Sequence, residues 1–209
     1  MMDSSALLPT QQAYDEVAEL YAGLFATELD TKPFDRAMFA AFAESAGDGP
    51  VADLGCGPGR ITGHLRALGL DAFGVDISPE MIRLARAAHP QLRFELGPMQ
   101  QLDAADSSIG GIVAWYSIIH TPPQLLPEVF AEFGRVLRPG GPLLLGFLAA
   151  DAPHDVQPYD HRVAPAFRWA TSRIEEMLRP YGFDVEARLS REPVEPERCP
   201  QAYLQVRKN

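Results

Sequence analysis

The 209-residue sequence predicts a three-layer α/β domain built on a mostly parallel sheet. Between residues 51 and 148, short apolar runs typical of buried strands alternate with segments whose apolar residues recur at helical spacing. This alternation is the pattern of parallel strands joined by crossover helices. Near the C-terminus, residues 183–189 and 202–206 alternate apolar with polar side chains, which predicts an antiparallel pair.

Composition and charge narrow the class of protein. The length suits one domain with a sizeable core, and 46% hydrophobic and 22% charged residues are ordinary globular values. A net charge of −10 disfavours a general nucleic-acid binder, which needs a basic surface. Two cysteines are too few for a disulfide framework, the first residues lack a signal-peptide pattern, and no apolar run is long enough to span a membrane. We therefore expect a cytoplasmic protein without nucleic-acid or membrane partners.

The predicted strands and helices follow from this patterning, after a loose tail over residues 1–10. Strands are expected at about 51–54, 71–76, 92–97, 111–116 and 142–148, ahead of the terminal pair. Helices are expected at about 11–25, 35–45, 61–68, 79–88, 127–137 and 171–181. Residues 149–165 lack periodicity and predict an irregular loop over the active site, as long loops in compact domains often are.

The first strand, Val51 to Leu54, runs into the glycine-rich loop 55–59 and then a helix. A strand, a tight glycine loop and a helix N-terminus form a nucleotide-binding turn, because glycines let the backbone approach a ligand that the helix N–H groups face. Asp53 lies two residues before the loop, where a carboxylate would repel a pyrophosphate but suits an ammonium group. Arg60 occupies the sixth position, where the dinucleotide fingerprint needs a small residue. The loop therefore favours a cofactor other than a dinucleotide.

The second strand ends at Asp76, about 20 residues beyond the glycine loop. A neighbouring parallel strand delivers its end beside that loop, and a carboxylate there can accept both hydroxyls of a ribose. Ser78 and Pro79 then supply an N-cap and a first-turn proline for the next helix.

The segment Asp53-Leu54-Gly55-Cys56-Gly57-Pro58-Gly59 resembles the first motif of class I S-adenosylmethionine (SAM) dependent methyltransferases. The spacing Tyr14-Asp15-x-x-Ala18-x-x-Tyr21 resembles the N-terminal lid helix of small-molecule members, and Leu137-Arg138-Pro139-Gly140-Gly141 is a turn typical of the same superfamily. The resemblance implies a three-layer Rossmann-like methyltransferase fold, with a mostly parallel seven-stranded sheet and an antiparallel C-terminal strand. It also implies one domain over residues 1–209, with lid helices at about 11–46 and a lid loop at about 149–170.

The resemblance implies SAM as the cofactor and S-adenosylhomocysteine (SAH) as the product. Asp53 would face the methionine ammonium and Asp76 the ribose. At the position after the third strand, the family commonly has an aspartate that contacts the adenine amino group. This sequence has Pro98 there, so adenine recognition would rest on backbone groups of Met99 and on the side chain of Gln100. The full set of expected cofactor residues is Tyr14, Tyr21, Asp53, Gly55, Cys56, Gly57, Asp76, Ile77, Met81, Pro98, Met99, Gln100 and Tyr116.

The chemistry expected from the resemblance is methyl transfer to an O, N or C nucleophile of a small, apolar or aromatic metabolite. This displacement mainly requires the nucleophile to be held in line with the methyl group in a site closed to water. A protonated nucleophile also needs a base, for which His120 and His161 are the candidates, while His154 fits a surface or lid-anchoring role. Aromatic residues could line the substrate pocket, namely Trp115, Tyr116, Tyr159, Phe167 and Trp169. We expect a monomer or homodimer, and no metal, because no cluster has ligand spacing.

Alternative functions remain open at this point. A SAM-binding cyclase or isomerase would use the same cofactor site, and a non-catalytic binding module would keep only the fold. A nicotinamide oxidoreductase is disfavoured by Asp53 and Arg60. The segment 116–119, Tyr-Ser-Ile-Ile, lacks the Asn/Asp-Pro-Pro-aromatic segment of DNA amino-methyltransferases, and the paired glutamates of protein arginine methyltransferases are missing after it.

Overall fold

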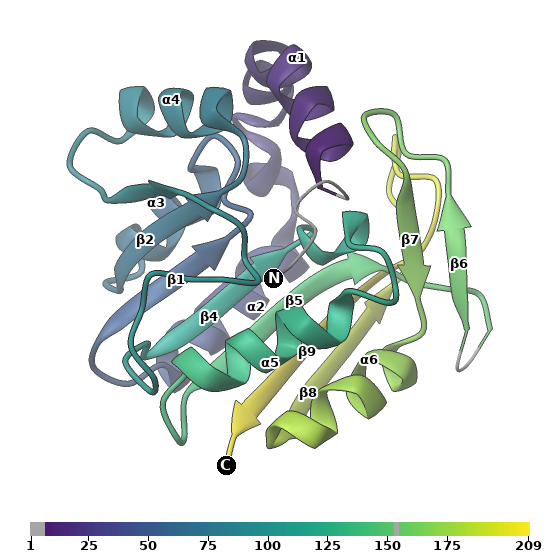
Figure 1. Ribbon diagram of the computed structural model, residues 1–209. Helices are drawn as coiled ribbons and strands as arrows, with labels where there is room; N and C mark the ends of the chain where they lie inside the picture. Colours follow the sequence, from purple (N-terminus) through teal and green to yellow (C-terminus); the bar gives the residue numbers. More distant parts are fainter. Residues whose placement is uncertain (1–6, 153–154) are drawn as a thin grey trace.

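A seven-stranded sheet in the order β3-β2-β1-β4-β5-β9-β8 forms the centre of the molecule (Figure 1). The computed structural model describes residues 7–152 and 155–209, so residues 1–6 of the expected tail and His154 lie outside it. β1 to β5 are parallel, whereas β9 runs antiparallel to both β5 and β8, as the sequence predicted. The strands are β1 Pro50–Leu54, β2 Asp71–Asp76, β3 Phe94–Leu96, β4 Gly111–Trp115, β5 Pro142–Leu148, β8 Phe183–Arg191 and β9 Gln201–Lys208.

Helices cover both faces of this sheet, which gives the expected three layers. They are α1 Leu8–Phe25, α2 Pro33–Ser45, α3 Arg60–Ala67, α4 Pro79–Ala88, α5 Leu126–Val136 and α6 Thr171–Leu178, with short 3-10 turns η2 Glu28–Thr31, η3 Ile118–His120 and η4 Arg179–Tyr181. Each predicted helix is present within a few residues. The tail prediction was wrong for residues 8–10, which belong to the first turn of α1 with a proline near its start.

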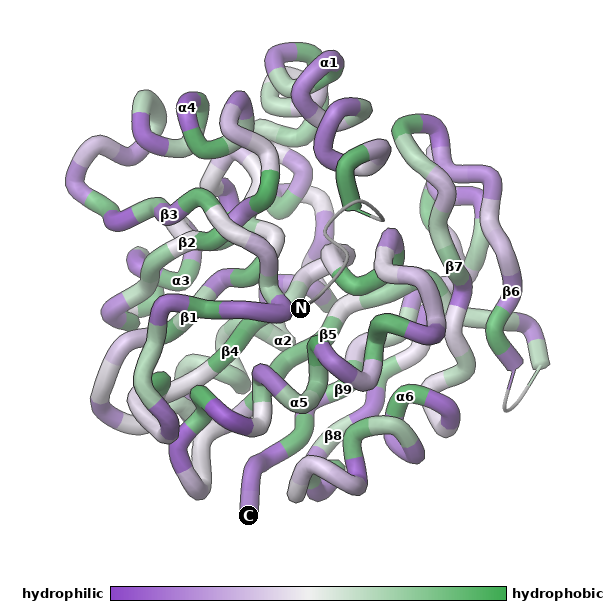
Figure 2. The backbone as a smooth tube through the Cα atoms, viewed as in Figure 1, coloured by the Kyte–Doolittle hydropathy of each residue, from purple (hydrophilic) through white to green (hydrophobic). Residues whose placement is uncertain are grey.

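The central strands are buried on both faces, and their side chains alternate between two cores. Ile112 and Ala114 pack in the core that includes α5 and α6, whereas Val113 and Trp115 pack in the core that includes α2 and α3. Figure 2 shows β4 and β5 as hydrophobic along their length, consistent with two-sided burial. Strand parity therefore decides which layer each side chain meets.

The expected irregular loop after β5 contains a small second sheet. β6 Val156–Tyr159 pairs antiparallel with β7 Ala166–Trp169, and this hairpin lies beyond the end of β5 beside the main sheet (Figure 1). The sequence did not reveal it because β6 contains a proline and only half-buried or exposed residues, which obscure a strand pattern. The hairpin carries His161 in its turn, on the side of the molecule where the parallel strands end.

α1 lies across the carboxyl ends of the strands, against α4 (Figure 1). Asp15 Oδ1 accepts a hydrogen bond from Ser78 Oγ at 2.5 Å and one from the Glu80 backbone N–H at 3.3 Å. Ser78 in turn caps α4 by accepting from the Met81 N–H at 3.1 Å, as its position predicted. One carboxylate thus fixes α1 to the N-terminus of α4. Among the described residues, none of the helices has the length and apolar character needed to cross a membrane.

Candidate cofactor and substrate site

A cavity of about 970 Å³ opens at the carboxyl ends of β1, β2 and β4, between the sheet, α1 and the β6–β7 hairpin. Open α/β sheets bind ligands at this edge, where the strand order reverses between β1 and β4. Twelve of the fifteen residues predicted for the site line the cavity: Tyr14, Tyr21, Gly55, Gly57, Asp76, Ile77, Met81, Met99, Gln100, Tyr116, His120 and His161. Asp53, Cys56 and Pro98 do not line it.

The glycine loop brings bare backbone to the cavity surface. Gly55 has φ +73° and a Cβ there would lie 2.2 Å from the Ser117 Cβ, so the position admits only glycine. Gly57 has φ +54°, and a Cβ on it would meet only the Met81 sulfur, at 4.0 Å. The space above Gly57 is therefore open, which suits the close approach of a ligand.

Asp76 is held at the floor of the cavity by the loop itself. Its Oδ2 accepts from the Gly57 N–H at 2.8 Å and its Oδ1 from the Ser78 N–H at 2.9 Å. Burial raises the pKa of this carboxyl, while the backbone N–H groups act in the opposite direction. A carboxylate has about four acceptor positions, so acceptor capacity remains for hydroxyl groups of a ligand.

Asp53, which we expected to face the ammonium of SAM, points toward α3 and away from the cavity. Its Oδ2 accepts from the Thr62 hydroxyl on α3 at 2.6 Å, and only 1% of the residue is exposed. The side chain has the same strand parity as Val51, whose core includes α2 and α3. Burial raises the pKa of this carboxyl to about 7. Its expected contact with an ammonium group is thus not direct in this geometry.

Cys56 and Pro98 also lie outside the cavity lining. Cys56 is buried with Ile82, Ala85 and Phe94, because its side chain points from the loop toward α4 and β3. The Pro98 carbonyl accepts the Gln101 N–H at 3.2 Å, which forms the turn that follows β3. Both residues shape the loops on either side of Asp76.

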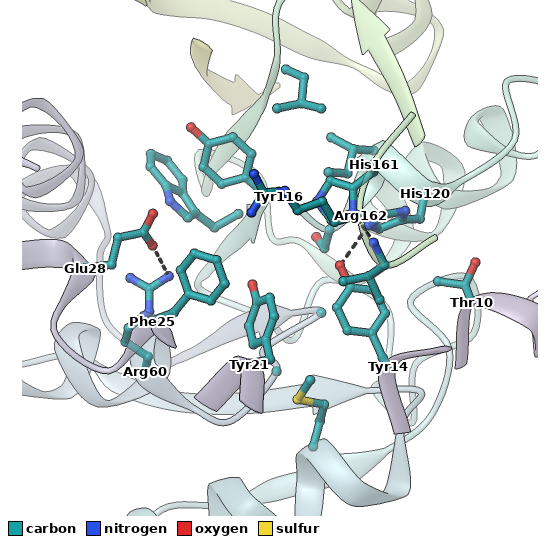
Figure 3. Close-up of a pocket in the computed structure, with 18 of the residues that line it drawn as sticks. Thr10, Tyr14, Tyr21, Phe25, Glu28, Arg60, Tyr116, His120, His161 and Arg162 are labelled. Atoms are coloured by element: carbon teal, nitrogen blue, oxygen red, sulfur yellow. Dashed lines mark hydrogen bonds and ion pairs between the residues drawn. The ribbon is translucent and has the colours of Figure 1, made fainter. Parts of the chain in front are cut away.

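An ion pair that the sequence did not reveal lines the cavity near Tyr21. Arg60 Nη2 lies 3.0 Å from Glu28 Oε2, and Figure 3 shows the pair beside Phe25 and Tyr21. Arg60 directly follows the glycine loop, but Glu28 comes from a short 3-10 turn whose position no periodicity indicates. Burial raises the pKa of Tyr21 to about 12; Arg60 opposes this effect, while Glu28 and Asp76 add to it. Tyr21 therefore lies close enough to the ion pair and to Asp76 to feel the charge of each.

Three buried polar atoms without a hydrogen-bond partner belong to residues that line the cavity. They are Arg60 Nη1, Gln100 Oε1 and Ser117 Oγ, among five such atoms in the described part of the chain. Buried polar groups are normally paired, so such atoms in a cavity indicate a missing ligand or water. Gln100 is 7% exposed and lies beyond β3, at the end of the cavity where an adenine was expected.

Two histidines lie at the other end of the cavity, below the hairpin (Figure 3). The Tyr14 hydroxyl lies 2.8 Å from His120 Nε2, and His120 Nδ1 lies 2.9 Å from the Pro165 carbonyl oxygen. Since a carbonyl can only accept, Nδ1 carries the proton and Nε2 accepts from Tyr14. His161 lies edge-on to His120, with ring centroids 4.9 Å apart.

Burial lowers the pKa of both histidines. For His120 the backbone hydrogen bond to Pro165 opposes this effect, and for His161 the neighbouring His120, Arg198 and Arg162 reinforce it, to about 4. His161 Nδ1 accepts the Val163 N–H at 3.3 Å, so its other nitrogen carries the proton in the neutral form. Both rings are therefore neutral near pH 7.

The aromatic residues expected in a substrate pocket divide into two groups. Trp115, Tyr116 and Tyr159 line the cavity. Phe167 and Trp169 pack into the main core instead. Tyr116 has φ +57°, a left-handed backbone conformation that is strained for an aromatic residue and that recurs at functional sites. No group of three His, Cys, Asp or Glu side chains suited to a metal ion occurs in residues 7–152 and 155–209.

The strand order and the glycine loop facing a carboxylate at the next strand's end define a Rossmann-like nucleoside-binding domain. Residues 51–141 match the family model described as methyltransferase domain. An uncharacterized methyltransferase of Mycobacterium tuberculosis is 41% identical over 96 residues, which cover 44% of this chain and 37% of that protein. The chain thus spans little more than a third of the length of that relative.

Solved structures with the same fold cover most of the chain. A SAM-dependent methyltransferase from Methanosarcina mazei has a TM-score of 0.68 at 20% identity, over 77% of this chain and 92% of its own. The 1,6-didemethyltoxoflavin-N1-methyltransferase of Burkholderia thailandensis, with bound 1,6-didemethyltoxoflavin and S-adenosylhomocysteine, has a TM-score of 0.67 at 21% identity, over 94% of this chain and 90% of its own. Residues 51–141 thus resemble a methyltransferase domain, and the chain as a whole shares the Rossmann-like fold of these SAM-dependent methyltransferases.

Proposed function

We propose that this protein transfers a methyl group from SAM to an O, N or C nucleophile of a small, apolar or aromatic metabolite. The observation that carries the proposal is the chemistry lining one cavity. Asp76 lies at its floor beside open glycine backbone, and the unpartnered Gln100 Oε1 and Arg60 Nη1 belong to its lining. A nucleoside linked to an amino acid offers hydroxyl, amino and carboxylate groups to these three residues.

The fit to SAM can be followed group by group. Asp76 would accept hydrogen bonds from the ribose hydroxyls, while Gln100 Oε1 would accept from the adenine amino group in place of the aspartate that Pro98 replaces. The Arg60–Glu28 pair matches the zwitterionic amino-acid end, since Arg60 Nη1 is free to bind a carboxylate and Glu28 faces an ammonium. Tyr14 and Tyr21 on α1 would cover the cofactor, with Tyr21 close to both the ribose and the ion pair.

SAM supplies an electrophilic methyl group on a sulfonium. The chain's own residues have to orient the nucleophile, exclude water and, where necessary, accept a proton. His120 is the better placed of the two histidines to accept one, because its Nε2 has a lone pair directed at the Tyr14 hydroxyl while its Nδ1–H is fixed by Pro165. His161 would orient the substrate by donating from its protonated nitrogen.

The proposal also covers the type of acceptor, the cellular environment and the oligomeric state. A small-molecule acceptor suits the aromatic lining of the cavity, as in the Burkholderia thailandensis enzyme with bound 1,6-didemethyltoxoflavin. Cys56 and Cys199 are free and buried, which suits a reducing, cytoplasmic environment. We propose that the protein works as a monomer or homodimer without nucleic-acid partners.

Calorimetric titration with SAM, SAH and NAD tests this function. We expect SAM and SAH to bind, and Asp76→Ala to weaken SAM binding by about 1–3 kcal/mol because ribose hydroxyls lose their acceptor. Asp71→Ala is the matched control, since Asp71 is exposed at the start of β2. Tighter binding of NAD than of SAM would overturn the proposal. SAM binding without methyl transfer to any acceptor would instead favour a cyclase, an isomerase or a binding module.

A further inference from the structure

The charged residues that line the cavity do not all pair with one another. The four cationic residues are Lys32, Arg60, Arg162 and Arg198, and the four acidic ones are Glu28, Asp76, Glu195 and Glu197. Arg60 pairs with Glu28, and Lys32 pairs with Glu197. Asp76 is bound by backbone N–H groups and Glu195 is exposed, so two arginines remain without a carboxylate partner in the described part of the chain.

These two arginines come from separate loops, and both line the cavity near its mouth as largely exposed side chains. Arg162 follows His161 in the turn of the β6–β7 hairpin, and Arg198 lies in the loop between β8 and β9. Both arginines lower the pKa of His161, as its burial does, and no acidic group is among the causes of the shift. The Arg198 side chain lies over the Tyr159 ring, 4.9 Å from its centroid, and Nη2 donates to the Asp160 carbonyl. Arg162 makes no side-chain hydrogen bond with the other described residues and points into the cavity in Figure 3.

The net charge of −10 makes the two unpaired arginines informative about the charge of the ligand. A protein of that charge repels anions at long range, so an anionic ligand needs local cations to bind. Guanidinium groups bind carboxylate and phosphate with paired hydrogen bonds, and both arginines retain N–H donors for this purpose. With His120 and His161 neutral, Arg162 and Arg198 supply the positive charge at this end of the described chain, and the nearby carboxylates of Asp160 and Glu195 are exposed to solvent.

We propose that the methyl acceptor is an organic oxyanion, a carboxylate or phosphate on an apolar or aromatic body, whose charged group binds between Arg162 and Arg198. This inference rests on the proposed function and names its substrate class. Tyr159, Ile119 and Val163 supply apolar surface beside the two arginines. The charged group anchors one end of the acceptor at the hairpin, and the rest of the molecule extends toward Tyr116 and the glycine loop.

Titration of the SAH-loaded protein with benzoate, phenyl phosphate and benzamide tests the inference. The three probes share one ring, and only benzamide is neutral. We expect at least one anion to bind about ten- to a hundredfold more tightly than benzamide, as charged hydrogen bonds predict. The tighter of the two anions identifies carboxylate or phosphate as the group recognised. SAH binding is measured first, so failure of the cofactor proposal is seen separately from failure of this one.

Variants decide whether the arginines are responsible. Arg162→Gln and Arg198→Gln should each remove most of the preference for the anion, whereas Arg162→Lys should retain part of it. Arg179→Gln is the control, because Arg179 is exposed in η4 and lies outside the cavity lining. Equal affinities for anion and benzamide, no anion binding at about 1 mM, or an equal loss in the Arg179 variant would overturn the inference. Thermal melts of all variants exclude unfolding as the cause of a loss.

Discussion

His120 is fixed through both ring nitrogens, which sets its tautomer before any substrate arrives. Its Nδ1–H donates to Pro165 and its Nε2 accepts from Tyr14, so a proton can be taken only at Nε2, from or by way of the Tyr14 hydroxyl. His161 has the opposite arrangement, because its Nδ1 accepts the Val163 N–H. His120 therefore has a hydrogen-bond acceptor at Nε2, whereas the neighbouring His161 has a donor at the same ring position.

We expect His120→Gln to lower kcat by about 10²- to 10⁴-fold with an acceptor that must lose a proton. The affinity for SAM should stay unchanged, because the cofactor groups lie at Asp76, Gln100 and Arg60. Steady-state kinetics and calorimetry measure the two effects. His161→Gln is the paired variant and should mainly raise KM. A larger loss of kcat in His161→Gln than in His120→Gln would reverse the assignment.

Asp53 makes folding stability depend on pH. Its pKa is raised by burial from 3.8 to about 7, so between these values the folded chain binds more protons than the unfolded chain. Stability must then fall as pH rises through this window. Asp53→Asn keeps an acceptor for Thr62 without a charge, so its stability relative to wild type should rise from about pH 4 to about pH 8.

Urea unfolding at several pH values measures this difference. Asp71→Asn is the control, since Asp71 is exposed and should show no such trend. The Asn variant should also bind SAM with wild-type affinity, because Asp53 faces Thr62 on α3. A parallel pH profile for wild type and Asp53→Asn would show that Asp53 is not the titrating group.

Strand ends and glycine positions could be read from the sequence, whereas side-chain direction could not. Asp76 lines the cavity because it ends a strand next to the glycine loop, a position that the sequence alone indicates. Asp53 faces Thr62 instead of the cavity, and motif position alone does not indicate this because strand parity sets the direction of the side chain. Glu28, Arg162 and Arg198 lie on turns that no periodicity marks, and only tertiary packing brings them to the cavity.

At the scale of elements, two carboxylates of α1 bond to α4: Asp15 at the N-terminus of α4, and the exposed Glu19 to Arg83 at 2.5 Å. Asp15 accepts from Ser78 Oγ and the Glu80 N–H, at the end of α4 where the helix dipole favours negative charge. Asp15→Ala should cost about 0.5–2 kcal/mol, the range seen for lost capping groups. It should also weaken SAM binding, since Tyr14 and Tyr21 lie on α1.

Limited proteolysis at α1, chemical denaturation and calorimetry measure these effects together. Glu16→Ala is the matched control, because Glu16 is the neighbouring exposed carboxylate. Wild-type SAM affinity in Asp15→Ala, combined with faster cleavage of α1, would mean that this helix does not cover the cofactor.

The sequence predicted helices and main-sheet strands better than it predicted the hairpin. Amphipathic helices such as α5 place five buried residues at helical spacing, and β4 and β5 are apolar throughout. β6 and β7 have mixed burial and pack beside the main sheet, so no simple period marks them. The element that carries the proposed anion site was therefore the one least visible in the sequence.

Across the whole molecule, a buried polar network joins the N-terminal segment to the C-terminal strands. Glu197 accepts from Lys32 near α2 and, at 2.5 and 2.7 Å, from Arg191 at the end of β8. Arg191 Nε donates to the Tyr203 hydroxyl at 2.8 Å, and that hydroxyl donates to Asp35 at 2.6 Å. Both cations are at least nine-tenths buried, so each depends on its acidic partner.

Glu197→Gln should lower the free energy of unfolding at neutral pH by about 3 kcal/mol, because two buried cations lose their shared counter-charge. The hydrogen bonds, largely from Arg191 and Lys32, lower the Glu197 pKa from 4.5 to about 2 against the effect of its burial. As pH falls through this window the unfolded chain takes up the proton first, so wild type loses this contribution and the two proteins should converge. Denaturant titrations from neutral pH to about pH 2 measure the convergence, with the exposed Glu192→Gln as control. A constant difference between wild type and Glu197→Gln down to the lowest pH would mean that packing, and not charge, holds the two ends of the chain together.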